Sequence, residues 1–147
     1  LILMGDPSQS GKADSGQIPS ATVKRLREQG VDSKIDLFLS MSNKPNLSKI
    51  GKKLQANPKG FMTQVVQNID QVKNLAENLK GYLIIPIILF PSQKNEKSAK
   101  FLNMDLAEYS QNFDKFVKDV HEITGDVLLT SPNDFTGLNE FLETPIN

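Results

Sequence analysis

The most apolar segment of the chain is Tyr82-Leu83-Ile84-Ile85-Pro86-Ile87-Ile88-Leu89-Phe90. Its β-branched residues and its short length predict a strand that is buried on both faces of a parallel sheet. Pro86 lacks a backbone N–H group and cannot donate to a neighbouring strand. The strand is therefore expected either to lie at a sheet edge or to be kinked at this residue.

Shorter strands are expected on both sides of this segment, at residues 1–4, 34–40 and 126–130. Apolar residues spaced by three or four predict helices at residues 18–29, from Leu47 to Leu54, at residues 61–79, and from Asp105 to Ile123. Strands that alternate with helices predict an α/β fold with a mostly parallel sheet and helices on both faces. Residues 1–130 are expected to form one domain, and residues 131–147 a loop or C-terminal tail.

Composition limits the chemistry that the chain can support. The 147 residues are 38% hydrophobic and 23% charged, with no cysteine and one histidine, His121. A disulfide framework and a thiolate zinc site are excluded, and His121 alone cannot hold a metal. No apolar run is long enough to span a membrane, so a cytoplasmic location is expected. Because the chain begins within an expected strand, it is interpreted as a fragment of a longer protein.

The segment after the first expected strand contains a Gly-Lys pair, Gly11-Lys12, which suggests a phosphate-binding loop. A Walker A loop has four residues between its first glycine and this pair, and a Ser or Thr follows the lysine to bind Mg²⁺. Here five residues separate Gly5 from Gly11, and Ala13 has no hydroxyl group. We therefore expect no ATP hydrolysis, no catalytic residue and no bound cofactor.

Charge is unevenly distributed, although the net charge is zero. Residues 1–60 carry ten Lys and Arg against five Asp and Glu, whereas residues 61–147 carry seven against twelve. The first part of the chain could therefore offer a basic surface to nucleic acid phosphates. Ordinary solvated lysines on the surface of a globular domain would give the same count.

The turn after the first strand resembles motif III of superfamily 1 helicases in Gly5, Asp6 and Gln9. Residues 89–95 resemble motif IV, without the arginine usual there. Together with residues 26–32, these segments are similar in pattern to the vestigial, RecD-like helicase repeat of conjugative plasmid relaxase-helicases. The resemblance implies a RecA/RecD-like motor subdomain that binds single-stranded DNA and carries a type IV secretion signal, within a parent relaxase or DNA helicase.

Three functions are consistent with these observations. The first is a non-catalytic module that binds single-stranded DNA weakly through basic side chains. A protein-docking module for a type IV secretion coupling protein is the second, and a small nucleotide-binding enzyme that uses residues Gly5 to Lys12 is the third. The DNA contacts expected for the first function are Lys12, Lys24, Arg25, Arg27, Lys44, Lys49, Lys52 and Lys53.

Overall fold

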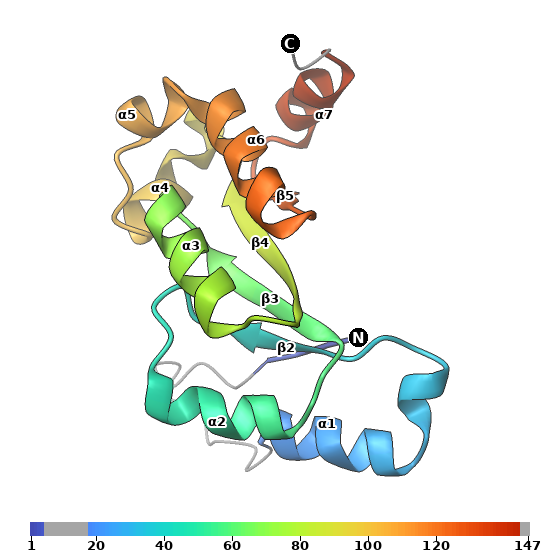
Figure 1. Cartoon of the computed structure of the whole chain (residues 1–147). Helices are drawn as coiled ribbons and strands as arrows, with labels where there is room; N and C mark the ends of the chain where they lie inside the picture. Colours follow the sequence, from blue (N-terminus) through green and yellow to red (C-terminus); the bar gives the residue numbers. More distant parts are fainter. Residues whose placement is uncertain (5–17, 145–147) are drawn as a thin grey trace.

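A computed structural model describes residues 1–4 and 18–144 of the chain (Figure 1). Five parallel strands form one sheet in the order β1-β2-β3-β4-β5. The strands are β1 (Ile2–Leu3), β2 (Phe38–Met41), β3 (Gly60–Val65), β4 (Leu83–Leu89) and β5 (Leu128–Thr130). The α/β fold and the parallel sheet are therefore confirmed.

Helices follow each of the described strands in the chain. They are α1 (Pro19–Glu28), α2 (Leu47–Gln55), α3 (Ile69–Asn78), α4 (Glu96–Phe101), α5 (Leu106–Ser110), α6 (Phe113–Thr124) and α7 (Phe135–Glu143). Two short 3₁₀ helices, η1 (Val31–Ser33) and η2 (Gln93–Asn95), lie in the connections. The single helix expected from Asp105 to Ile123 is two helices, α5 and α6, because residues 111–112 do not continue the first. The Asp105 side chain caps α5 by accepting hydrogen bonds from the backbone N–H groups of Ala107 and Glu108.

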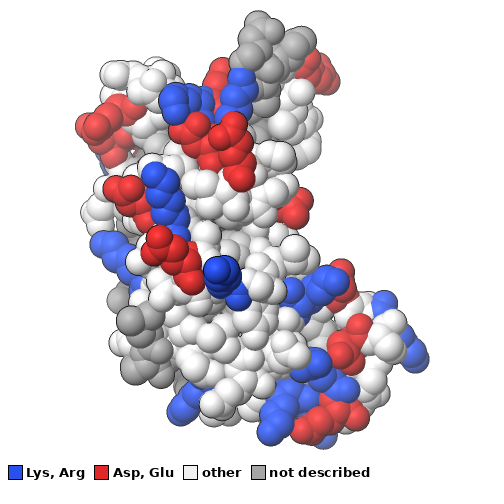
Figure 2. Space-filling model, viewed as in Figure 1, with Lys and Arg blue, Asp and Glu red and all other residues white. Residues whose placement is uncertain are grey.

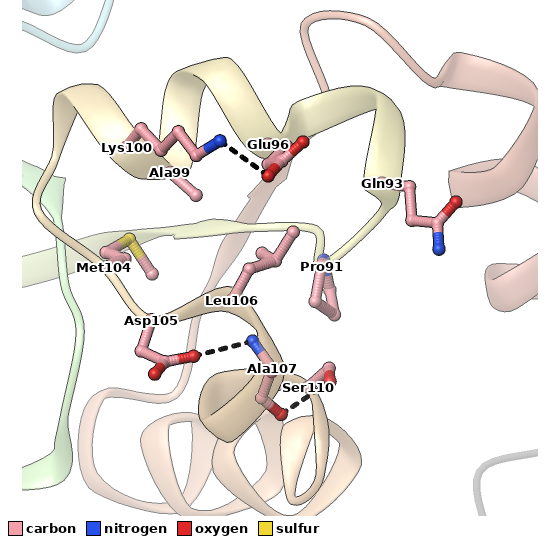
Figure 3. Close-up of a pocket in the computed structure, with 10 residues that line it drawn as sticks. All are labelled: Pro91, Gln93, Glu96, Ala99, Lys100, Met104, Asp105, Leu106, Ala107 and Ser110. Carbon is pink, nitrogen blue, oxygen red and sulfur yellow. Dashed lines mark hydrogen bonds and ion pairs between the residues drawn. The ribbon is translucent and has the colours of Figure 1, made fainter.

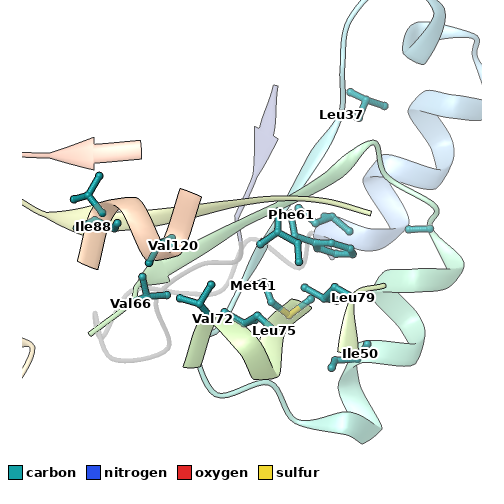
Figure 4. Close-up of a cluster of buried hydrophobic side chains, with 14 of the residues drawn as sticks. Leu37, Met41, Ile50, Phe61, Val66, Val72, Leu75, Leu79, Ile88 and Val120 are labelled. Atoms are coloured by element: carbon teal, nitrogen blue, oxygen red, sulfur yellow. The ribbon is translucent and has the colours of Figure 1, made fainter. Parts of the chain in front are cut away.

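The helices α1, α2, α3 and α6 all lie on one face of the sheet, whereas the sequence suggested helices on both faces. Val23 of α1, Ile50 of α2, Val72 of α3 and Val120 of α6 belong to one buried cluster. The strand residues of that cluster include Leu39, Phe61 and Ile84, which are in register and therefore point to the same side. Phe61 and Ile88 of the cluster are labelled in Figure 4. A sequential strand order explains this, because right-handed crossovers that never reverse direction place their main helices on one face. The short helix α4 differs, since its Ala99 packs against Leu89 and Val65 on the other face.

A helix was expected to begin at residue 61, and this prediction was wrong because residues 60–65 form β3. Phe61, Val65 and Ile69 recur at helical spacing, yet the helix begins only at Ile69. Asn68 supplies the N-cap, since its side chain accepts a hydrogen bond from the backbone N–H of Gln71 at 3.0 Å. The chain between Gly60 and Asn68 thus holds a whole strand and a turn.

The prediction for residues 131–147 was also wrong in part, because residues 135–143 form α7. Its N-cap is Asp134, which accepts a hydrogen bond from the backbone N–H of Gly137 at 3.2 Å. Leu138 is buried and Phe141 packs against the main core. This segment is consequently part of the packed fold and not a free tail.

Strand β4 occupies an inner position between β3 and β5, so Pro86 does not mark a sheet edge. The pairing of β3 with β4 shifts register between Met62 and Val65, opposite the proline. There the hydroxyl of Thr63 accepts the hydrogen bond of the Ile87 N–H at 3.2 Å. A bulge in the neighbouring strand therefore accommodates the missing donor.

Candidate ligand site at the carboxyl ends of the strands

Polar side chains gather where the parallel strands end. Asn43 and Lys44 follow β2, whereas Gln67 and Asn68 follow β3. The Asn43 side-chain amide donates to the carbonyl of Val65 at 3.0 Å and so joins the ends of the two strands. In parallel α/β sheets this edge is where ligands bind, because loops from neighbouring strands meet there.

Gln67 connects this edge to the segment that carries α4 and α5. Its side-chain amide donates to the carbonyl of Leu102 at 2.8 Å, and its backbone N–H donates to the Gln71 side chain at 2.8 Å. A hollow of about 570 Å³ lies on one side of Gln67 and Asn68, next to Asn43 and Lys44. A second hollow of about 290 Å³ lies on the other side, next to Asp105, Glu108 and Tyr109.

We call these residues the β3-end site: Asn43, Lys44, Gln67, Asn68, Asp105, Glu108 and Tyr109. The two hollows share Gln67 and Asn68, and the larger one lies within the size range of small-molecule sites. Asp70 also lines the larger hollow. Three carboxylates and one ammonium group therefore surround the site, which makes it unfavourable for a phosphate.

Tyr109 is the unusual residue of this site. Its ring packs against Phe113 and Phe116, with ring centroids 5.8 and 5.6 Å away. Its hydroxyl group is buried and has no hydrogen-bond partner among the described residues. Burial also raises the pKa of this hydroxyl, so it stays protonated as a donor. A buried polar group without a partner destabilises a fold, and such a group requires an explanation.

A separate pocket of about 780 Å³ lies beside the end of β4, between α4 and α5 (Figure 3). Ala99, Met104 and Leu106 give it apolar walls. The Lys100 ammonium lies 2.7 Å from the Glu96 carboxylate at the pocket. Its hydrogen bond and charge lower the pKa of Glu96. These two charges are thus already paired with each other.

A hydrogen-bonded polar cluster joins the loops after β4 and β5. Asn95 is fully buried; its amide donates to the Phe90 carbonyl and the Ser131 hydroxyl and accepts from the Asn133 N–H, at 2.9 to 3.0 Å. The carboxylate of Asp134 accepts from the Ser92 hydroxyl and from Lys94, whose ammonium lies 2.9 Å away. Each of these groups is satisfied within the chain, so the cluster holds the two loops together.

Stability in acid should depend on Asp134. Hydrogen bonds from Ser92 and Lys94 lower its pKa from an ordinary value of 3.8 to about 2. The ionised group therefore stabilises the fold above the unfolded-state pKa, and this contribution disappears as the pH falls from about 4 towards 2. We expect the melting temperature to fall across this range, and less steeply for Asp134→Asn. Equal acid slopes for the two proteins in a thermal melt series would contradict this role.

Among the expected DNA contacts that the structure describes, two basic side chains are engaged within the chain. Arg27 pairs with Asp32 at 3.1 Å and donates to the Ala56 carbonyl at 3.3 Å, which fixes the end of α1. Lys53 is half-buried and donates to the carbonyl of Ser40, and burial lowers its pKa. Lys24, Arg25, Lys44 and Lys52 are exposed. On the face shown in Figure 2, basic side chains are interspersed with acidic ones around α1.

Other expected site residues fall outside the described part of the chain. Lys12 and the motif III-like residues Gly5, Asp6 and Gln9 belong to residues 5–17, and the Lys49 side chain is also outside it. Within residues 1–4 and 18–144, no group of three or more metal-ligating side chains occurs. None of the helices described there is long and apolar enough to cross a membrane.

Comparison with known proteins finds no family model that matches the chain and no curated protein with significant similarity to it. The site must therefore be interpreted from its own geometry. The sequence did not predict Gln67, Asn68 or Tyr109 as site residues. Their position depends on β3, which had been taken for the start of a helix.

Proposed function

We propose that the chain is a ligand-binding α/β domain that holds a small polar molecule in the β3-end site. The observation that carries this proposal is the Tyr109 hydroxyl, a buried donor without a partner in the described structure. A ligand that accepts this hydrogen bond would explain why the chain tolerates its cost; because the hydroxyl is fully buried, α5 or the ring must shift for the ligand to reach it. The location at the carboxyl ends of parallel strands supports the same function.

The chemistry of the site indicates which ligands it suits. Asp70, Asp105 and Glu108 outnumber Lys44, so a neutral or cationic molecule is favoured over a phosphate or another anion. The amides of Asn43, Gln67 and Asn68 provide further donors and acceptors. We infer a neutral or cationic ligand with an acceptor for Tyr109 and donors for the surrounding oxygen atoms.

Tyr109→Phe separates a functional role of the hydroxyl from a structural one. We expect the variant to be as stable as the wild type or more stable, because it removes an unpaired buried group. A library of neutral and cationic fragments would be screened by ¹H–¹⁵N NMR, and hits should shift the amides of residues 43–44, 67–68 and 105–109. Their affinity should fall about tenfold in Tyr109→Phe, as expected when one hydrogen bond is lost.

Tyr82→Phe is the matched control. The Tyr82 hydroxyl donates to the carbonyl of Leu54 at 3.3 Å, away from the β3-end site. Its removal should therefore reduce stability slightly and leave fragment binding unchanged. Fragments that bind elsewhere, or that bind Tyr109→Phe as tightly as the wild type, would refute the proposal.

Single-stranded DNA binding by a RecA/RecD-like module is the second proposal, and it rests on the exposed Lys24, Arg25, Lys44 and Lys52. The described strands follow one another in sequence order, whereas doubly wound sheets reverse their order at a switch point. This difference favours the first proposal. Docking to a secretion coupling protein and nucleotide binding by residues Gly5 to Lys12 stay predictions as well.

DNA binding can be tested by measuring oligo-dT affinity over a series of salt concentrations. Three or four phosphate contacts should give a slope of about −2 to −3 in log K against log salt. Lys24→Glu with Arg25→Glu should abolish the binding, because both side chains are exposed on α1. Lys73→Glu with Lys80→Glu, on exposed positions elsewhere, is the control. Undetectable affinity at low salt would exclude this function for the chain.

A further inference from the structure

The face of the sheet opposite the connecting helices is apolar and partly exposed. We call it the open face; its partly exposed residues are Ile2, Phe38, Met62, Leu83, Ile85, Ile87 and Leu128. At its carboxyl end, Val65 and Leu89 point to the same side and are covered by Ala99 of α4 and by Met104. Ile2, Leu83 and Leu128 are 40%, 44% and 40% exposed, respectively. Parallel sheets are almost always covered on both faces. The open face is therefore a surface that needs a partner.

Both outer strands also have one side without a partner strand in the described structure. Strand β1 pairs with β2 alone, and strand β5 pairs with β4 alone. Their outward N–H and C=O groups can accept another parallel strand. A suitable partner would satisfy these edges and cover the open face at the same time.

We propose that this partner is a second copy of the chain, joined edge to edge. Strand β5 of each copy would lie parallel to β1 of the other around a two-fold axis along the strands. The ten strands would then form a closed barrel, with both open faces in its interior. Stacking two open faces as a sandwich would cover the apolar residues but leave all four sheet edges unpaired.

Charge supports a second copy as the occupant. No Lys, Arg, Asp or Glu occupies a described strand position of the open face, so two identical faces meet without repulsion. The whole chain has a net charge of zero, which removes the general repulsion between two copies. The β3-end site lies at the mouth of such a barrel, and the proposal does not depend on the ligand.

Sedimentation velocity of the whole chain at several concentrations tests the oligomeric state. We expect a dimer for the wild type. Ile85→Lys, at the centre of the open face, and Leu128→Lys, near the β5 edge, should each weaken the dimer at least about thirtyfold. Phe101→Lys is the matched control, because Phe101 is 85% exposed on α4, outside the open face. Circular dichroism would confirm that each variant is folded.

Hydrogen exchange distinguishes edge pairing from face stacking and does not depend on the variants. Amides of residues 2–3 and 128–130 should be protected in the dimer and lose this protection on dilution to monomer. A wild-type monomer at the highest soluble concentration, an open-ended oligomer, or a dimer with unprotected edges would overturn the proposal. The proposal would also be overturned if both variants were folded and still formed the dimer. A monomer that binds an apolar dye would assign the open face to a different partner.

Discussion

Phe113→Ala is expected to lower the free energy of unfolding by about 3–5 kcal/mol, the largest effect among the substitutions considered. Phe113 is 4% exposed at the start of α6, and its ring centroid lies 5.9 Å from that of Phe90 and 5.3 Å from that of Phe141. It therefore joins β4 to α7. Loss of the ring would leave a cavity, because the neighbouring rings cannot easily move closer to fill it.

Chemical denaturation of the variant checks this value, and Phe101→Ala is the control. Phe101 is 85% exposed, so its truncation should change the free energy of unfolding by less than about 0.5 kcal/mol. In Phe113→Ala, hydrogen exchange should become faster in α7 than in α3. A loss of less than about 1 kcal/mol would mean that the aromatic cluster closes the gap by repacking.

Asn95→Ala is expected to cost about 2–4 kcal/mol of stability. The alanine would leave the Asn133 N–H without its acceptor, and the Phe90 carbonyl would keep only its hydrogen bond from the Ser92 N–H. Both groups lie in the loops after β4 and β5 and are partly buried, and a donor left unpaired there costs more than an ordinary hydrogen bond contributes. Denaturation by urea, followed by circular dichroism, measures the change.

Asn139→Ala provides the comparison for Asn95. Asn139 is exposed on α7, where alanine has the higher helix propensity, so this variant should be at least as stable as the wild type. If Asn95→Ala unfolded at the same urea concentration as Asn139→Ala, water would be replacing the lost amide without cost. The cluster would then not hold the two loops together.

The sequence predicted those elements whose pattern is local. Helix α1 begins at a proline in its first turn, and β4 is a long β-branched run, so both were found close to their observed bounds. Strand β3 was missed because its Phe61 and Val65 share helical spacing with residues of α3. Helix α7 was missed because its short apolar stripe, Leu138 and Phe141, becomes visible only against the core that it covers.

The candidate site was less predictable than the fold, for a physical reason. Tyr109 fits an aromatic stripe of a helix, and the pattern says nothing about its hydroxyl group. The group becomes informative only when the chain brings α5 next to the turn after β3, about forty residues earlier. Polar residues after strands can be found from sequence only when each strand is itself found, and β3 was not.

The sequential order of the strands also has a consequence for how the chain folds. Each described strand pairs only with strands that are its neighbours along the chain, so no strand must wait for a distant segment. Such short-range pairing favours rapid folding, because little loop-closure entropy is lost at each step. During synthesis, the strand with which each new strand pairs would already have left the ribosome. The sheet could therefore grow by one strand and its helix at a time, in sequence order.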